Sequence, residues 1–250
     1  MTSERESSTN LPNPPSFEEW VEYCFVHGQR DFNGTSKDSP EAIEQRENRF
    51  LLMDRVLVVG YLTRLFEKPS FIADRYTDDQ IADATWFLFG HGSQFISFKG
   101  LNVAEDAQAR CIRAVATLYT DLFDRVCGRR GTDLNTAFHG QKGIDGAVYM
   151  IWDMGGLEFT VMFPDSPPHL IEPGTSVLEA VLAKCRTSAC LVSALHGVGH
   201  VIGFNICGKS PAEQAKVDRF QGMIDSFLAT REVPDWLRKY AGEARTGNIE

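Results

Sequence analysis

Two histidines lie four residues apart in the stretch Leu195-His196-Gly197-Val198-Gly199-His200. On a helix this spacing places both imidazoles on one face, where they could bind one metal ion. A zinc-protease helix carries a glutamate directly after its first histidine, and Gly197 occupies that position here. The pair therefore predicts a metal site at His196 and His200 that is not of the zinc-protease kind.

The glycines of this stretch require an explanation, because each glycine inside a helix costs about 1 kcal/mol relative to alanine. Close approach of another backbone would offset that cost. Gly199 and Gly203 are also four residues apart, which predicts a flat groove along the helix. A second interpretation stays open, in which this is a tightly packed inner helix whose histidines form hydrogen bonds with their neighbours.

Four of the six histidines precede a glycine: His27, His91, His139 and His196. If the helices stack in layers, these positions could converge, so we expect a pocket or surface that includes His91, His139, Gly197 and Gly199. The alternative is local, since glycine often follows a helix end and histidine is favoured in the last helical turn.

Other catalytic patterns are missing. There is no Gly-x-Ser-x-Gly elbow, no phosphate-binding loop and no dinucleotide-binding glycine pattern. Cys185 and Cys190 lack a second cysteine pair, so we expect them to be core thiols and not a zinc knuckle. The sequence therefore favours a binding role over an enzyme, and it does not identify a cofactor.

The composition restricts the partners. The 250 residues carry a net charge of −9 and 43% are hydrophobic. An acidic surface repels phosphates, which argues against nucleic acids and anionic membranes as partners and favours another protein. The polar N-terminus does not resemble a signal peptide, and no apolar run approaches ~18 residues. With six cysteines that read as reduced thiols, these features predict a cytoplasmic protein.

Helix start signals recur along the chain, mostly as a capping residue followed three positions later by Glu or Gln. One signal, Ser39-Pro40, precedes a long helical stretch that we expect to continue to Pro69, with Phe50, Met53 and Val56 on its buried stripe. The other expected starts are Ser16, Thr77, Asn102, Ser176, Thr187, Ser210 and Pro234.

The segment 147–163 is ambiguous. Residues 148–152 and 157–163 could form a short hairpin, but we favour a helix that ends near Trp152. For the domain organisation, we expect a disordered tail at 1–15, one helical domain at 16–244 and a C-terminal tail at 245–250.

Successive helix pairs without intervening strands predict an all-α fold. The rhythm of these pairs over roughly 40–240 resembles HEAT or armadillo helical repeats. That resemblance implies antiparallel helix pairs stacked into a solenoid, and an irregular bundle stays open because no fixed period is present. Two functions follow as hypotheses. The first is a protein-interaction module, such as an adaptor or a toxin-neutralising immunity protein. The second is a metal- or small-ligand-binding protein, in which His196 and His200 are ligands with His91 or His139 nearby.

Overall fold

The computed structural model describes residues 13–90, 102–129, 134, 142–153, 157–208 and 210–249. These residues form helices and no strand, which confirms the predicted all-α class. The helices of the first half are α1 (Phe17–Tyr23), α2 (Gln29–Phe32), α3 (Pro40–Arg46), α4 (Arg55–Glu67), α5 (Ile72–Arg75), α6 (Asp78–Phe89), α7 (Glu105–Leu118) and α8 (Asp124–Gly128). Those of the second half are α9 (Gly143–Tyr149), α10 (Glu158–Val161), α11 (Pro168–Lys184), α12 (Ser188–Asn205), α13 (Pro211–Thr230) and α14 (Asp235–Arg245).

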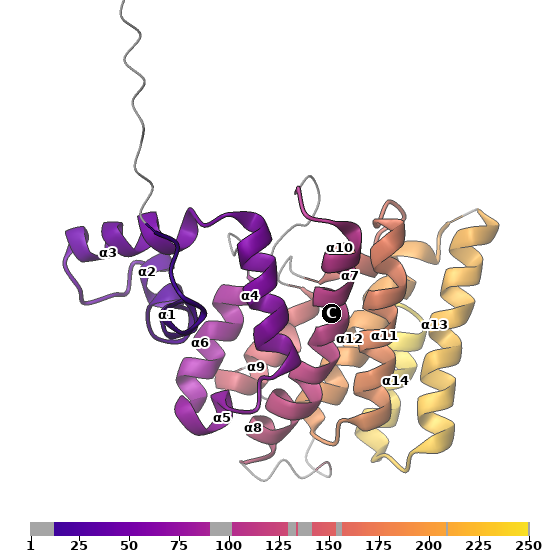
Figure 1. Ribbon diagram of the computed structural model, residues 1–250. Coiled ribbons are helices and arrows are strands. Elements are labelled where there is room, and N and C mark those ends of the chain that lie inside the picture. Colours follow the sequence, from indigo (N-terminus) through magenta and orange to yellow (C-terminus); the bar gives the residue numbers. More distant parts are fainter. Residues whose placement is uncertain are drawn as a thin grey trace, which may run out of the picture.

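The longer helices lie in two rows (Figure 1). In one row α4 contacts α7, α7 contacts α11, and α11 contacts α13. In the other, α6 contacts α9, α9 contacts α12, and α12 contacts α14. The short helices α1 to α3 lie at one end of the molecule, and α13 and α14 lie at the other. Among the described helices, none combines the length and the apolar run that a membrane crossing requires.

Side chains that cap helices set many of the predicted starts. Ser16, Thr77 and Ser210 each form a complete capping box with the Glu or Gln three residues later. Ser39 caps α3, with Pro40 at the first helical position. In each case the capping oxygen accepts a hydrogen bond from a backbone N–H that has no partner within the helix.

The prediction of one long helix from Pro40 to Pro69 is wrong. The helical turns that begin at Pro40 end at Leu51, and a new helix, α4, begins at Arg55. The cause is Asp54, whose carboxylate accepts hydrogen bonds from the N–H groups of Val56 and Leu57. The predicted stripe also fails at Val56, whose relative exposure is 55%.

Two predicted starts are wrong. Ala104, not Asn102, is the N-terminal capping residue of α7, and no side chain caps it there. Ser176 lies inside α11, which already begins at Pro168, and its hydroxyl donates to the carbonyl of Pro173. A capping side chain can act only where backbone N–H groups lack partners, and at Ser176 the helix is already formed upstream.

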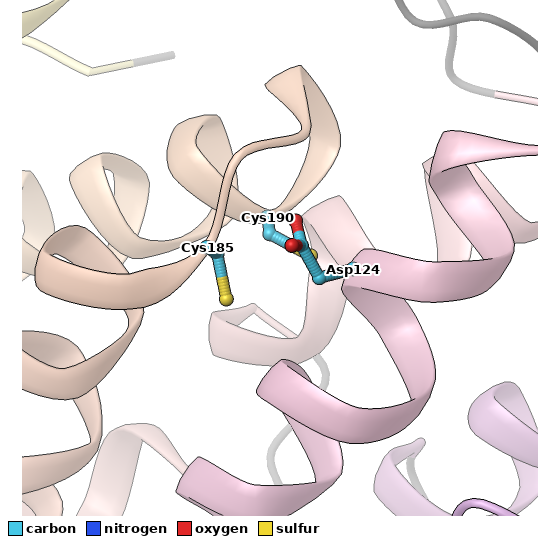
Figure 2. A group of neighbouring side chains, drawn as sticks. All are labelled: Asp124, Cys185 and Cys190. Atoms are coloured by element: carbon cyan, nitrogen blue, oxygen red, sulfur yellow. The ribbon is translucent and has the colours of Figure 1, made fainter.

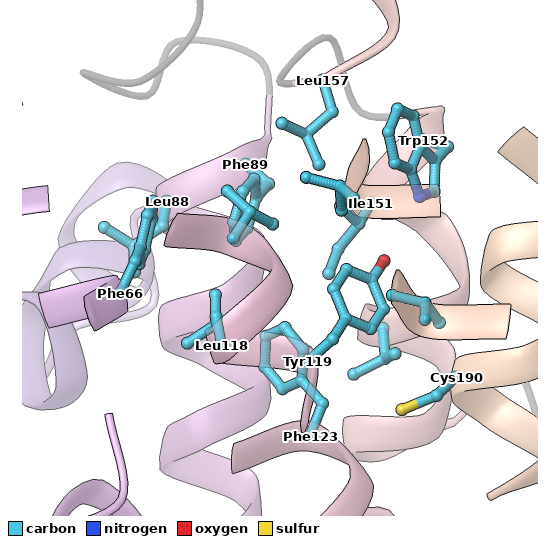
Figure 3. Close-up of a cluster of buried hydrophobic side chains, with 14 of the residues drawn as sticks. Phe66, Leu88, Phe89, Leu118, Tyr119, Phe123, Ile151, Trp152, Leu157 and Cys190 are labelled. Carbon is cyan, nitrogen blue, oxygen red and sulfur yellow. The ribbon is translucent and has the colours of Figure 1, made fainter. Parts of the chain in front are cut away.

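The hairpin considered for 148–163 is excluded for the residues that the structure describes there. Helix α9 runs to Tyr149 and a 3-10 turn continues over Met150–Trp152, which confirms the favoured helix that ends near Trp152. Figure 3 shows Ile151, Trp152 and Leu157 beside Phe89 and Tyr119 in the buried core. This segment is apolar because other helices surround it. It does not alternate between a buried and an exposed face, as a strand of a hairpin would.

Helix α12 is the most enclosed element described. Every residue from Ser188 to Gly199 is buried. The helix contacts α9, α11, α13 and α14. Its start at Thr187 matches the prediction, but the capping group comes from another helix: Oδ1 of Asp124 accepts hydrogen bonds from the N–H groups of Arg186 and Thr187 and from the Thr187 hydroxyl.

Candidate metal centre

Asp153 and the two histidines of α12 converge on one point. Nε2 of His196 lies 2.6 Å from Oδ2 of Asp153, and Nε2 of His200 lies 2.7 Å from Oδ1 of the same carboxylate. The two Nε2 atoms are 2.9 Å apart. Two imidazoles and a carboxylate are typical ligands of Zn²⁺ and of other divalent transition metals.

Gly197 and Trp152 bring Asp153 to this point. Trp152 is buried, and its indole ring lies so close to α12 that a Cβ atom on Gly197 would be 2.8 Å from the ring. Real Cβ atoms essentially never come that close, so the glycine is what admits the indole. Asp153 is the next residue along the chain, and packing of the indole therefore places its carboxylate beside His196 and His200.

The other ring nitrogen of His196 is held by two tyrosines. Nδ1 lies 3.0 Å from the hydroxyl of Tyr149 on α9 and 3.1 Å from the hydroxyl of Tyr240 on α14. A histidine that binds a metal through Nε2 carries its proton on Nδ1 and donates it to such a group. These two hydroxyls are therefore suited to orient His196 with its Nε2 lone pair toward the carboxylate.

The centre is buried on one side and open on the other. The side chain of His196 is 2% exposed, whereas those of His200 and Asp153 are 25% and 28% exposed. Phe204, one helical turn after His200, stacks near its ring and is itself exposed. A water molecule or a small ligand could therefore approach from the side of His200 and Asp153.

Protons alone do not satisfy the three close contacts. If both Nε2 atoms carry protons and donate to Asp153, neither can accept from the other across the 2.9 Å that separates them. If only one Nε2 carries a proton, the lone pair of the other faces the carboxylate at 2.6 Å or 2.7 Å. A divalent cation between the three side chains would remove this conflict, because it attracts all three lone pairs at once.

The separations also fit a particular ligand arrangement. With metal–ligand bonds of 2.0–2.2 Å, neighbouring ligand atoms lie about 3.3–3.6 Å apart around a tetrahedral ion but about 2.8–3.1 Å apart around an octahedral one. The 2.9 Å between the two Nε2 atoms is close to the octahedral value. The 2.6 Å and 2.7 Å distances run to different oxygens of Asp153, so both carboxylate oxygens face the histidine pair.

The electrostatics of Asp153 follow from the same contacts. Partial burial by itself raises the pKa of this carboxyl, but hydrogen bonds from His196 and His200 outweigh burial and hold the pKa below its usual range. Asp153 is therefore ionised near neutral pH, which is the state that binds a cation.

The structure describes the surroundings of both glycines that were predicted to line a pocket. Gly197 and Gly199 are both buried in helix α12. The expected close approach of another backbone is confirmed at Gly199, because a Cβ there would lie 3.2 Å from Cα of Ala244, and the side chain of Ile249 covers the same position. The groove predicted along Gly199 and Gly203 is thus filled by the C-terminal segment.

The histidines converge only in part. His196 and His200 meet as their spacing predicts, whereas His27 lies 3.8 Å from Asp38 in the N-terminal region and His169 bonds to Gln108. His91 and His139 lie outside the described residues. The third group of the centre is thus Asp153, which the sequence did not indicate as a ligand.

Asp153, Tyr149 and Tyr240 could not be found from local spacing. Asp153 is 43 residues before His196, and Tyr240 is 44 residues after it. The nearest signal is the pair Trp152-Asp153 at the end of an apolar run, which places a carboxylate directly beside a core side chain.

Comparisons with known proteins found no relative of this chain. The resemblance to HEAT or armadillo repeats therefore stays a prediction that rests on the rhythm of the helix pairs. No protein-family model matches the chain, and no curated protein and no solved structure matches it either.

Proposed function

We propose that this protein binds one divalent transition-metal ion through Asp153, His196 and His200. The observation that carries the proposal is the convergence of one carboxylate and two imidazole nitrogens within 2.9 Å of one another. The Nδ1 contacts of His196 support it, because metal-binding histidines are usually oriented by such a partner on the other ring nitrogen.

Three protein ligands would leave at least one coordination position open. Structural zinc sites use four protein ligands, whereas catalytic sites use three and keep a position for water or substrate. The exposure of His200 and Asp153 puts that position on the solvent side of the centre. The chemistry that follows is Lewis-acid catalysis, in which the ion polarises a carbonyl or phosphoryl oxygen or lowers the pKa of its bound water to about 7.

The test is metal content and affinity in untagged protein. The protein is stripped with a chelator and titrated with Zn²⁺ and, without oxygen, with Fe²⁺. We expect the double variant His196→Ala/His200→Ala to bind one equivalent less than the wild type, and Asp153→Asn to bind more weakly. His169→Ala is the matched control, because His169 is a partly exposed histidine that bonds to Gln108, away from the centre.

The proposal fails if the double variant keeps the full stoichiometry while its circular-dichroism spectrum shows that it is folded. His200→Ala alone guards against misfolding, because this side chain is partly exposed and its loss leaves the contacts between His196 and the two tyrosines in place.

Protein interaction is the second candidate function, and exposed apolar side chains before and within α4 favour it. Leu52 is 66% exposed and Val56 is 55% exposed. The two residues lie four positions apart in the chain, and contiguous exposed apolar patches can mark a binding surface. Cross-linking in an extract of the source organism, compared between the wild type and Leu52→Ser/Val56→Ser, tests this role: a partner lost only from the variant supports it, and equal recovery excludes this surface.

A further inference from the structure

We infer that a second metal site, of the thiolate type, lies where α8, α11 and α12 meet, with Asp124, Cys185 and Cys190 as ligands for Zn²⁺. One ligand atom from each of these side chains lies within 4.8 Å of the other two. Figure 2 shows Cys185 at the end of α11, Cys190 at the start of α12, and Asp124 on α8. This site shares no residue with the centre at Asp153, His196 and His200.

A third thiol adjoins the cluster. The thiol of Cys190 lies close enough to those of Cys185 and Cys127 to interact with both. Cys127 is buried on α8, one helical turn after Asp124. Cys127 is outside the group of three ligands, and the fourth position of a tetrahedral Zn²⁺ stays open for water.

The ligand-bearing backbone is fixed by hydrogen bonds. Oδ1 of Asp124 accepts from the N–H groups of Arg186 and Thr187, directly after Cys185. Nη1 of Arg231 donates to the carbonyl oxygen of Cys185 at 2.7 Å. Oδ2 of Asp124 takes no part in these bonds. Such outer contacts are typical of metal sites, because they hold the ligands in place before the ion binds.

The charges around the cluster balance an anionic complex. Zn²⁺ with two thiolates and one carboxylate has a net charge of −1. The N-terminus of α12, which carries a partial positive charge, lies beside Cys190, and the guanidinium of Arg231 lies beside Cys185. A buried cluster of this charge is therefore compensated from two sides.

Metal binding at this site must displace protons. The structure has all six cysteines as thiols, and Cys185 and Cys190 are buried. Free cysteine thiols, with an ordinary pKa of about 8.5, carry their protons near neutral pH. The balanced step is that Zn²⁺ replaces one proton on each of the two thiols, forms two Zn–S bonds and releases two protons to solvent.

Isolated buried thiols act as small apolar side chains and need no ligand. Cys111 is such a thiol, because the side chain that it contacts is that of Thr63 and not another cysteine. The cluster differs from it in having a second thiol and a carboxylate whose ligand atoms lie within 4.8 Å of one another. Cys111→Ser is therefore the matched control for the experiment.

Cobalt titration tests the site, since thiolate ligands give Co²⁺ a sulfur-to-metal charge-transfer absorption in the near ultraviolet that nitrogen and oxygen ligands do not. The full chain is reduced with a non-thiol reductant and titrated with Co²⁺. We expect this band in the wild type, in Cys111→Ser and in His196→Ala/His200→Ala, and we expect Cys185→Ser/Cys190→Ser to lose it. Adding Zn²⁺ should then remove the band by displacing Co²⁺, and in a separate titration of the metal-free protein Zn²⁺ should release two protons per site in weakly buffered solution.

No charge-transfer band in the reduced wild type overturns the inference, as does a band that persists in a folded Cys185→Ser/Cys190→Ser. If that variant does not fold, Asp124→Asn decides, because its amide oxygen can still accept the bonds from Arg186 and Thr187. We expect Asp124→Asn to weaken Zn²⁺ binding roughly tenfold or more, and unchanged affinity argues against the site. The variants of His196 and His200 should not change the charge-transfer band. The experiment therefore tests the thiolate site independently of the proposed site at Asp153, His196 and His200.

Discussion

The hydroxyl of Tyr240 lies 3.1 Å from Nδ1 of His196, although 44 residues separate the two along the chain. This contact brings α14, the last helix, into the candidate metal centre. It depends on Gly199, because the backbone of Ala244 could not pack so close to α12 beside a larger side chain. The glycines between the two histidines therefore admit the two segments that complete the centre: Trp152-Asp153 at Gly197 and α14 at Gly199.

Removing the tyrosine hydroxyls should weaken metal binding without unfolding the protein. Tyr149→Phe and Tyr240→Phe each leave one hydroxyl for Nδ1 of His196, so we expect small losses. The double variant leaves none, and its Kd should rise about tenfold or more. Isothermal titration with Zn²⁺ measures the change. Tyr61→Phe, whose hydroxyl donates to the carbonyl of Pro15, is the control, and equal affinity of the double variant and this control would contradict the expectation.

A side chain at Gly197 should destabilise the fold. The added methyl group of Gly197→Ala would press on the indole of Trp152, and such overpacking costs about 1–3 kcal/mol. Gly222→Ala on α13 is the matched control, because nothing lies within 4 Å of the added Cβ there. We expect this control to stabilise the helix by up to about 1 kcal/mol. Urea unfolding of both variants measures the difference, and similar midpoints for the two would refute the packing argument.

The cap on α12 should contribute measurably to stability. Asp124→Ala leaves the N–H groups of Arg186 and Thr187 without their acceptor, and loss of such a cap costs about 0.5–2 kcal/mol. Asp124→Asn keeps an oxygen at this position and should lose less. The comparison is made by urea unfolding in the presence of a chelator, so that metal at Cys185 and Cys190 does not contribute. Equal losses for Ala and Asn would show that the oxygen does not act as a cap.

The stability of the N-terminal region should depend on pH through Glu19. The pKa of Glu19 is lowered to about 2. The largest cause is a hydrogen bond from the backbone N–H of Ser16, and the second largest is a hydrogen bond from Arg49. Since the folded pKa is below the unfolded value of about 4.3, the ionised carboxylate stabilises the fold above pH 4.3 and this contribution is lost as the pH falls toward 2.

Glu19→Gln removes this titration. The difference in unfolding free energy between wild type and Glu19→Gln should therefore be constant from pH 7 to about 5 and shrink below that. Arg49→Met, which removes only the second hydrogen bond, should shrink the pH dependence in part. A difference that stays constant down to pH 2 would contradict the assignment.

Local signals in the sequence were enough to predict the helical class and several helix starts. The capping boxes at Ser16, Thr77 and Ser210 depend on two residues three positions apart, so the motif is visible in the sequence alone. The break between Leu51 and Arg55 was not predicted, because its apolar residues continue the helical spacing and only the carboxylate of Asp54 interrupts it.

Only the part of the candidate centre that lies on a single helix could be predicted from the sequence. The spacing of His196 and His200 depends on one helix and predicted that they share a face. Asp153 and Tyr240 reach them through packing between helices that are far apart in sequence, and no periodicity encodes such a contact. The choice of His91 or His139 as the nearby group stays a prediction, since both lie outside the described residues.

The enclosure of α12 has a consequence for the order in which the chain can fold during synthesis. Its buried residues face α9 and α11, which the ribosome makes before it, and also α13 and α14, which come after it. A nascent chain that ends near Asn205 therefore exposes an apolar helix whose later neighbours do not yet exist. The native packing around α12 can therefore be completed only after α13 and α14 have been synthesised.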